Sequence, residues 1–203
     1  PRYLAVFDFE TRFEGHRRTA GQATQLGDRL VLLSFAVSTN VPPFNSSIHF
    51  DVDESDENLF DRFWAHLEQI SEKANKLLQV RWRSPLRQLN KEITQLAAAN
   101  KLKWVDGKRL KHLTRLRTRL DRFIGSLPVL GFNSGSFDLP LVKNFIAKKL
   151  IGTEYHIIKS GQSIMALTTP TLRVLDVLSY VAPGYSLASF LKAYRPELPS
   201  EAV

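Results

Sequence analysis

Two carboxylates near the start of the chain have the type and spacing to do chemistry. Asp8 and Glu10 are separated by one residue and follow an apolar run that begins at Tyr3. In a strand, side chains alternate between faces, so both carboxylates would share one face while Phe7 and Phe9 point into a core. Two such acids repel each other unless a cation lies between them, and Mg²⁺ prefers carboxylate oxygens. The spacing therefore predicts a divalent metal site at the end of a buried strand.

Two more acidic residues follow or interrupt apolar runs further along the chain. Asp138 comes after a strand expected over 127–132 and opens a helix expected over 138–150. An Asp in the first helical turn can act as a cap worth about 0.5–2 kcal/mol, or it can face a metal. The Asn, Gly and Phe residues before it favour the metal. Asp176 is embedded in another expected strand, 172–178.

The pattern around Asp8 predicts the strands that position it. A polar, turn-rich loop is expected over Arg12–Asp28, followed by a long buried strand over Arg29–Thr39. Pro42 and Pro43 end that strand, and the alternating run Ser47–Val52 predicts another one. The result is an N-terminal meander of three strands.

Helical periodicity and turn residues predict the remaining elements. Ser55 is expected to cap a long amphipathic helix that continues to about Gln79. His66 lies off the apolar stripe of this helix and is expected on the surface. A hairpin is expected over 155–167, and Ser186 is expected to cap a last helix. These elements predict an α/β fold.

The formal charge of +8 is concentrated in one segment. Residues 81–120 contain two acidic residues, Glu92 and Asp106, and twelve basic ones, so the segment carries +10 and the rest of the chain −2. The basic residues are Arg81, Arg83, Arg87, Lys91, Lys101, Lys103, Lys108, Arg109, Lys111, Arg115, Arg117 and Arg119. A block of this kind favours nucleic acid as a partner over a pair of merely solvated helix faces.

The basic block is expected to form two helices of its own. Pro85 is expected to separate it from the preceding helix, and Gly125 to end its second helix. In both helices the Arg and Lys residues lie opposite a Leu-rich stripe. Trp82 and Trp104 flank the block and are interpreted as packing residues, although base stacking is the alternative.

Composition limits the class of protein. The chain has 203 residues, enough for one domain of 1–203 with an insertion. It contains no Cys, which excludes disulfides and thiolate chemistry and favours an intracellular protein. No apolar run approaches the roughly 18 residues of a membrane span, and no signal peptide is visible. Because the chain opens without Met, we expect it to be a piece of a longer protein.

These motifs, in this order, resemble the 3′→5′ exonuclease domain of family B DNA polymerases. Asp8-Phe9-Glu10 followed by Thr11 is similar to the first motif of that family, and Asn133, Phe137 and Asp138 are similar to the second. The amino-acid sequences of residues 131–135 and 175–177, and of residues 182–194 after them, resemble the protein-primed branch of the family. That branch is found in viruses, linear organellar plasmids and Maverick/Polinton elements. The resemblance implies an RNase H-like (DnaQ-type) fold with a mixed central sheet, in which residues 81–125 are a basic helical insertion.

The resemblance also implies a mechanism and a set of roles. The parent would be a DNA-directed DNA polymerase whose proofreading domain hydrolyses the 3′-terminal nucleotide with two Mg²⁺ or Mn²⁺ ions. Asp8 would hold both ions, Glu10 would hold one and orient the attacking water, and Asp138 would help to hold the other. Thr11, Asn133 and Phe137 would hold the single-stranded 3′ end of a primer–template. Asp176 would lie near that strand or serve a structural role. Arg115, Arg117 and Arg119 are the candidate DNA contacts of the insertion.

One motif of the family has no match. Its third exonuclease motif is a Tyr followed four residues later by Asp, and it is expected beyond the last helix of this chain. Tyr194, in that helix, does not match it, because Leu198 stands at the position of the Asp. The expectation is a fragment that lacks one carboxylate. Three alternatives remain: a catalytically incomplete DNA-binding module, a module that binds a terminal protein primer, and an RNase H-like nuclease that acts on RNA.

Overall fold

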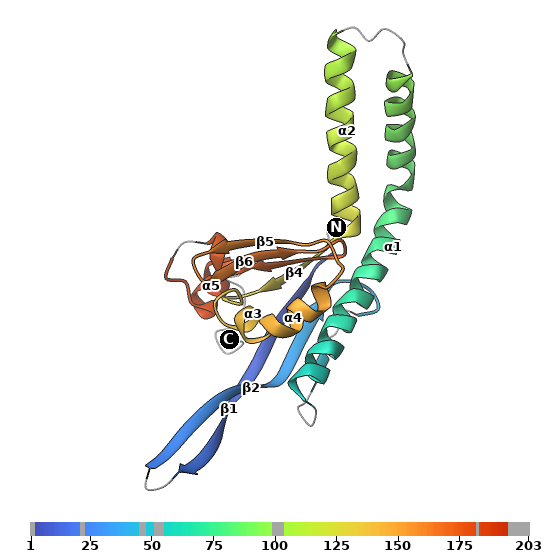
Figure 1. The fold of residues 1–203 in the computed structure, drawn as a ribbon. Coiled ribbons are helices and arrows are strands. Elements are labelled where there is room, and N and C mark those ends of the chain that lie inside the picture. The colour runs from blue at the N-terminus through green and yellow to red at the C-terminus, as the bar shows by residue number, and fades with distance from the viewer. Residues whose placement is uncertain are drawn as a thin grey trace.

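The chain folds around a mixed β-sheet. The structure, a computed structural model, describes residues 3–20, 23–44, 48–50, 55–98, 104–181 and 183–194. Within these residues the sheet has seven strands in the order β3-β2-β1-β4-β7-β6-β5 (Figure 1). The strands are β1 Ala5–Ala20, β2 Ala23–Thr39, β3 Ile48–Phe50, β4 Leu127–Gly131, β5 His156–Ser160, β6 Ser163–Thr168 and β7 Leu172–Asp176. The helices are α1 Asp56–Ala97, α2 Trp104–Gly125, α3 Asp138–Leu141, α4 Lys143–Leu150, the 3₁₀ helix η1 Val177–Tyr180 and α5 Leu187–Tyr194.

The pairing of the strands confirms the predicted α/β class and the N-terminal meander. Strands β1, β2 and β3 are antiparallel neighbours, and β1 is parallel to β4, which is parallel to β7. The predicted hairpin is β5 with β6, and β6 joins β7 in antiparallel fashion. The strand predicted over Ser47–Val52 is described only for β3, since Ser47, Asp51 and Val52 lie outside the described residues.

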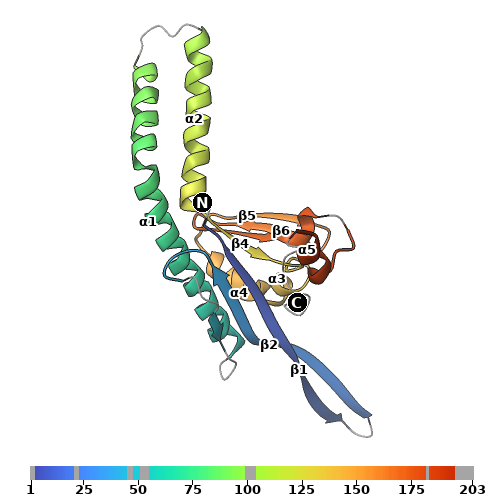
Figure 2. The ribbon, with the colours of Figure 1, turned by 180° about the vertical axis from the view of Figure 1, so that it is seen from behind.

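The loop predicted over Arg12–Asp28 is wrong. Strand β1 runs on to Ala20 and β2 begins at Ala23, and the two pair continuously from Ala5 with Thr39 to Ala20 with Ala23. This long hairpin extends away from the body of the protein (Figures 1 and 2). Main-chain hydrogen bonds hold a two-stranded ribbon together, and they leave no mark on the pattern of side chains. Residues 12–28 have no apolar alternation that would predict a strand.

Aromatic side chains join α1 to the sheet. The Phe63 ring of α1 lies 5.5 Å from Phe7 and 4.8 Å from Phe9, and 5.0 Å from Phe35 of β2. Helix α4 belongs to the same core, because Phe145 stacks on Phe60 of α1 with ring centroids 5.7 Å apart. Helices α1 and α4 thus cover the face of the sheet to which Phe7 and Phe9 point.

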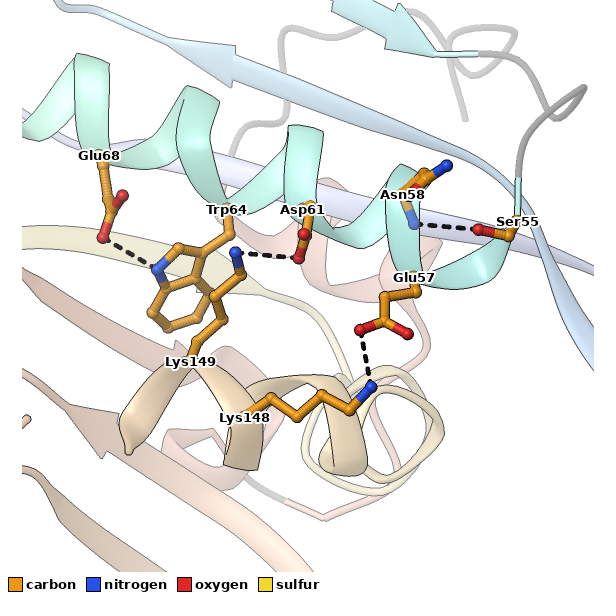
Figure 3. Close-up of polar contacts among 8 residues, drawn as sticks. All are labelled: Ser55, Glu57, Asn58, Asp61, Trp64, Glu68, Lys148 and Lys149. Carbon is orange, nitrogen blue, oxygen red and sulfur yellow. Dashed lines mark hydrogen bonds and ion pairs between the residues drawn. The ribbon is translucent and has the colours of Figure 1, made fainter. Parts of the chain in front are cut away.

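Polar contacts fix the start of α1, as predicted for Ser55 (Figure 3). The Ser55 hydroxyl accepts a hydrogen bond of 3.3 Å from the backbone N–H of Asn58. Two ion pairs then tie α4 to this end of α1: Lys148 lies 2.6 Å from Glu57, and Lys149 lies 2.9 Å from Asp61. Further along α1, the Trp64 indole N–H donates to Glu68 at 3.0 Å.

The helix break predicted at Pro85 is wrong, because α1 continues through it to Ala97. A proline inside a helix removes one hydrogen bond, here to the carbonyl of Arg81, and costs about 3 kcal/mol. Both residues are exposed, so water can reach that carbonyl. Packing of α1 on α2 offsets the cost: Trp82 meets Phe123 edge to face at 6.0 Å, and Leu89 is buried. Residues 81–97 of α1 and the whole of α2 form a helical arm that projects from the sheet (Figure 1).

The prediction that His66 lies on the surface is also wrong. Its side chain is buried and its ring meets Phe44 edge to face at 5.6 Å. Burial lowers the pKa of His66, because the charged imidazolium loses solvation. Phe44, which follows β2, therefore packs on this side of α1. Separately, none of the described helices is long and apolar enough to cross a membrane.

Candidate active site

Three adjacent parallel strands deliver carboxylates to one edge of the sheet. Register aligns Val6 of β1 with Leu130 of β4, and Leu130 with Leu175 of β7. Asp8 lies two residues beyond the aligned position on β1, and Asp176 lies one residue beyond it on β7. Because parallel strands point the same way, Asp8 lies just past the part of β1 that pairs with β4, and Asp176 is the last residue of β7, so both lie on the side of the sheet where β4 and β7 end. This is the edge where open α/β sheets usually place their sites.

The predicted alternation on β1 is confirmed. Phe7 and Phe9 are 3% and 5% exposed, whereas Asp8 and Glu10 on the opposite face are exposed. The two Phe rings fix this orientation because both pack on Phe63. The register with β2 shifts between Glu10 and Thr11, and Thr11 is half-buried. A bulge at this point re-aims the strand directly after the carboxylate pair.

A tight turn connects β4 to α3 and carries Asp138 back to the edge. Asn133 adopts φ 58°, a left-handed conformation that Asn tolerates better than most residues. Ser134 is fully buried, and its carbonyl accepts from the Leu139 N–H at 2.8 Å. The Gly135 carbonyl accepts from the Ile164 N–H of β6 at 3.0 Å. The turn is therefore fixed both to the helix that follows and to the sheet.

Two glycines in this turn are structurally required, and the sequence reasoning missed that requirement. A β-carbon on Gly135 would lie 2.2 Å from the Ile164 carbonyl oxygen and 2.9 Å from an Asp176 carboxylate oxygen. A β-carbon on Gly131 would lie 2.5 Å from that of Ser134. The signal available in the sequence was a pair of glycines four residues apart, directly after a strand and before an Asp that opens a helix.

Asp138 is the most perturbed carboxyl group among the described residues. It is 4% exposed, and its pKa is raised to about 7. Burial is the largest cause and the charge of Asp8 the next; the Asp138 backbone N–H lowers the pKa, and the charges of Asp176 and Glu10 raise it further. The pKa of Asp8 is also raised, by partial burial and by the charge of Glu10. Asp8, Glu10 and Asp176 therefore lie close enough to Asp138 for their charges to oppose its ionisation.

Asp176 has a structural role in this cluster. Its side chain is 2% exposed, and one oxygen accepts from the Leu178 N–H at 3.1 Å. The other oxygen accepts from the Ser179 hydroxyl at 3.1 Å. These bonds cap η1, which agrees with the prediction of a structural role for Asp176. Its charge nevertheless contributes to the raised pKa of Asp138.

The cluster has the donor chemistry of a divalent metal site. Asp8, Glu10 and Asp138 supply carboxylate oxygens, and the repulsion among them is the kind that a cation relieves. In the part of the chain that the structure describes, no three acidic or His side chains converge on one point as metal ligands. Because Asp138 has a pKa near 7, an ion would also have to displace a proton from it at neutral pH.

The candidate DNA contacts fall into two separate places. Asn133 is exposed and Phe137 is 48% exposed, and both flank the turn that leads to Asp138. Arg115 and Arg119 are exposed on the helical arm. Arg117 is directed inward: its Nε donates to Asn90 of α1 at 2.8 Å, and it pairs with Asp121. The structure does not bring the arm and the carboxylates together.

Comparison with known proteins adds no assignment. No protein-family model matches the chain, and neither the curated proteins nor the solved structures contain a significant match.

Proposed function

We propose that this chain is a 3′→5′ proofreading exonuclease domain with an RNase H-like fold, part of a family B DNA polymerase of the protein-primed type. The observation that carries the proposal is the carboxylate cluster beside Asp8 of β1 and near the carboxyl ends of β4 and β7, with Asp138 buried and charged neighbours around it. A mixed sheet in which an antiparallel meander adjoins parallel strands supports the RNase H-like assignment.

Different residues of the chain would have different roles in phosphodiester hydrolysis. Asp8, Glu10 and Asp138 would hold divalent ions, which supply an activated water and neutralise charge on the phosphate. Asp138 would first have to give up its proton, since its pKa is about 7. The exposed Phe137 ring offers a face for a terminal base, and the exposed Asn133 amide offers hydrogen bonds to sugar or phosphate.

A second candidate is a module that binds DNA or a terminal protein without cutting. Two observations favour it. Asp176 is already engaged in capping η1, and the described carboxylates do not converge on a single ion position. In this case the carboxylate cluster would not hydrolyse DNA, and the helical arm would bind the DNA or the terminal protein.

The test compares the parent chain with Asp8→Asn in two measurements. The first is digestion of a 5′-labelled single strand in Mg²⁺, where stepwise loss from the 3′ end is expected for the parent and not for the variant. The second is Mn²⁺ binding by calorimetry, which reports the site without hydrolysis. Glu154→Gln, an exposed carboxylate outside the cluster, is the control. A parent that binds no Mn²⁺ and leaves DNA intact would refute the nuclease proposal, and DNA binding by that inert parent would support the second candidate.

A further inference from the structure

The outer side of α2 carries a row of basic side chains. Lys111, Arg115, Arg119 and Arg122 follow one another at intervals of four, four and three residues. Residues so spaced lie on one face of a helix. All four are exposed. We call these four residues the basic row.

The apolar seam of the arm explains why the basic row points outward. Apolar side chains recur on each helix at alternating intervals of three and four residues, the spacing of two helices packed side by side. They are Trp82, Leu86, Leu89, Ile93 and Leu96 on α1 and Leu110, Leu113, Leu120 and Ile124 on α2. All of these are buried or half-buried. Arg117 occupies the position between Leu113 and Leu120, which is why it turns inward to Asn90. The basic row occupies the positions opposite this seam.

The charge of the basic row is not neutralised within the arm. The acidic partners near it are already used, Glu92 by Arg109 and Asp121 by Arg117. Among the described residues, none of the four members of the row forms an ion pair with a carboxylate. Four cations on a rigid helix therefore face solvent together, which is unfavourable without an anionic partner.

We propose that the basic row binds the phosphate backbone of duplex DNA. Eleven residues separate Lys111 from Arg122, or about 16 Å at 1.5 Å per residue. That length matches roughly five steps of 3.4 Å along one strand of a duplex. Single strands are usually held by aromatic stacking as well as by charge. Among the described side chains of α2, Phe123 is the one Phe, Tyr or Trp, and it packs on Trp82. The other ring is the small imidazole of His112, which is exposed. The row thus offers regularly spaced charge without an exposed Phe, Tyr or Trp beside it, which favours a duplex.

The basic row lies away from the carboxylate cluster. Helix α2 ends at Gly125 and leads into the amino end of β4, while the carboxylates lie beyond its carboxyl end. The base of α2 and the amino end of β1 lie together in both views (Figures 1 and 2). Along α2 the row extends from about 4.5 Å from Gly125, at Arg122, to about 21 Å, at Lys111. The row would therefore contact duplex at a distance from the 3′ end, and this contact does not depend on hydrolysis.

The test measures binding of a fluorescent 20-base-pair duplex in EDTA over a series of salt concentrations. Four phosphate contacts contribute a slope of about −3.6 to a plot of log affinity against log salt concentration. This slope corresponds to about a 150-fold loss of affinity between 50 and 200 mM salt. The variant with Lys111, Arg115, Arg119 and Arg122 changed to Gln should lose that part of the slope. Circular dichroism and the thermal midpoint of each variant check that the arm remains folded.

A matched control separates this surface from net charge. The control changes to Gln the four exposed cations in residues 81–97 of α1, with the same change in charge: Arg81, Arg83, Arg87 and Lys91. The salt slope of this control should change by less than half as much as the slope of the basic-row variant. An equal effect of both variants, or none from the first, would overturn the assignment. A larger loss for a single strand than for the duplex would overturn the choice of duplex. Because EDTA prevents metal-dependent cleavage, failure of the nuclease proposal leaves this result unaffected.

Discussion

Replacing Asp138 by Asn tests whether the carboxylate cluster is electrostatically strained. Asn has nearly the shape of a protonated Asp and keeps an oxygen for the hydrogen bond from its own backbone N–H. It cannot ionise. The substitution therefore removes the charge that burial, Asp8, Asp176 and Glu10 all disfavour. We expect Asp138→Asn to stabilise the protein at neutral and alkaline pH in the absence of divalent ions.

The magnitude follows from the pKa of Asp138, raised from 3.8 to about 7. A group whose pKa is raised on folding holds its proton more tightly in the folded state. Its stabilising contribution is complete below the unfolded pKa and is lost as the pH rises through the folded one. The loss is about 1.4 kcal/mol per pH unit across this window, or at most about 4 kcal/mol by pH 8. The variant should escape this loss, so its advantage should grow from pH 4 to pH 7 and then level off.

Urea unfolding in EDTA at pH 4.5, 6 and 8 measures this advantage. For a slope of about 2 kcal/mol per molar urea, the full effect at pH 8 moves the midpoint by about 2 M. At pH 4.5 the same slope gives an advantage of about 1 kcal/mol, so the two midpoints should differ by only about 0.5 M. Adding Mg²⁺ at pH 8 should stabilise the parent more than the variant, because the variant keeps Asp8 and Glu10 but lacks the third charge that the ion neutralises.

A variant that is less stable than the parent by the same amount at every pH would refute the reasoning. In that case Asp138 would stabilise the start of α3 as a first-turn residue, and the substitution would remove that stabilisation. Burial and the neighbouring carboxylates would then not disfavour its charge. Glu154→Gln controls for general removal of a negative charge and should show no such dependence on pH.

Two further substitutions test the turn and the substrate contact. Gly135→Ala would place a methyl carbon 2.2 Å from the Ile164 carbonyl oxygen, which is backbone and cannot rotate away. Urea unfolding should show a loss of about 1–3 kcal/mol, against a gain of up to about 1 kcal/mol for Gly107→Ala, a helical site with nothing within 4 Å. Equal effects of the two substitutions would contradict the close approach at Gly135. Phe137→Ala should change the unfolding free energy little, since the ring is 48% exposed. It should weaken single-strand binding by about 1–3 kcal/mol, and unchanged binding would remove Phe137 from the DNA site.

Local patterns in the sequence predicted the elements that place the carboxylates. Alternation with a period of two oriented Asp8 and Glu10 correctly because the pleat of a strand itself places Phe7 and Phe9 on the opposite face. The cap at Ser55 depends only on residues within one helical turn, and it was also predicted. Such features follow from sequence because the interactions that decide them are near neighbours.

The errors share a cause, which is that distant contacts decided the outcome. Pro85 stays within a helix because α2 packs beside it, and no residue close to Pro85 in sequence shows this. His66 packs against Phe44, which is 22 residues earlier in the chain. The requirement for glycine at position 135 comes from β6 and β7, which follow it in the chain. None of these contacts has a signature in the local pattern.

The separation of charge across the molecule connects the two proposals. The carboxylate cluster repels a phosphate backbone, and the chain outside residues 81–120 has a net charge of −2. Long-range attraction of DNA must therefore come from the helical arm, whereas the cluster can accept a phosphate only after its own charge is reduced by protons or by divalent ions. Adding Mg²⁺ should accordingly strengthen binding of a single strand at the cluster and weaken duplex binding at the basic row through screening. These opposite responses distinguish the two surfaces in one protein, because a single shared site could respond to Mg²⁺ in only one direction.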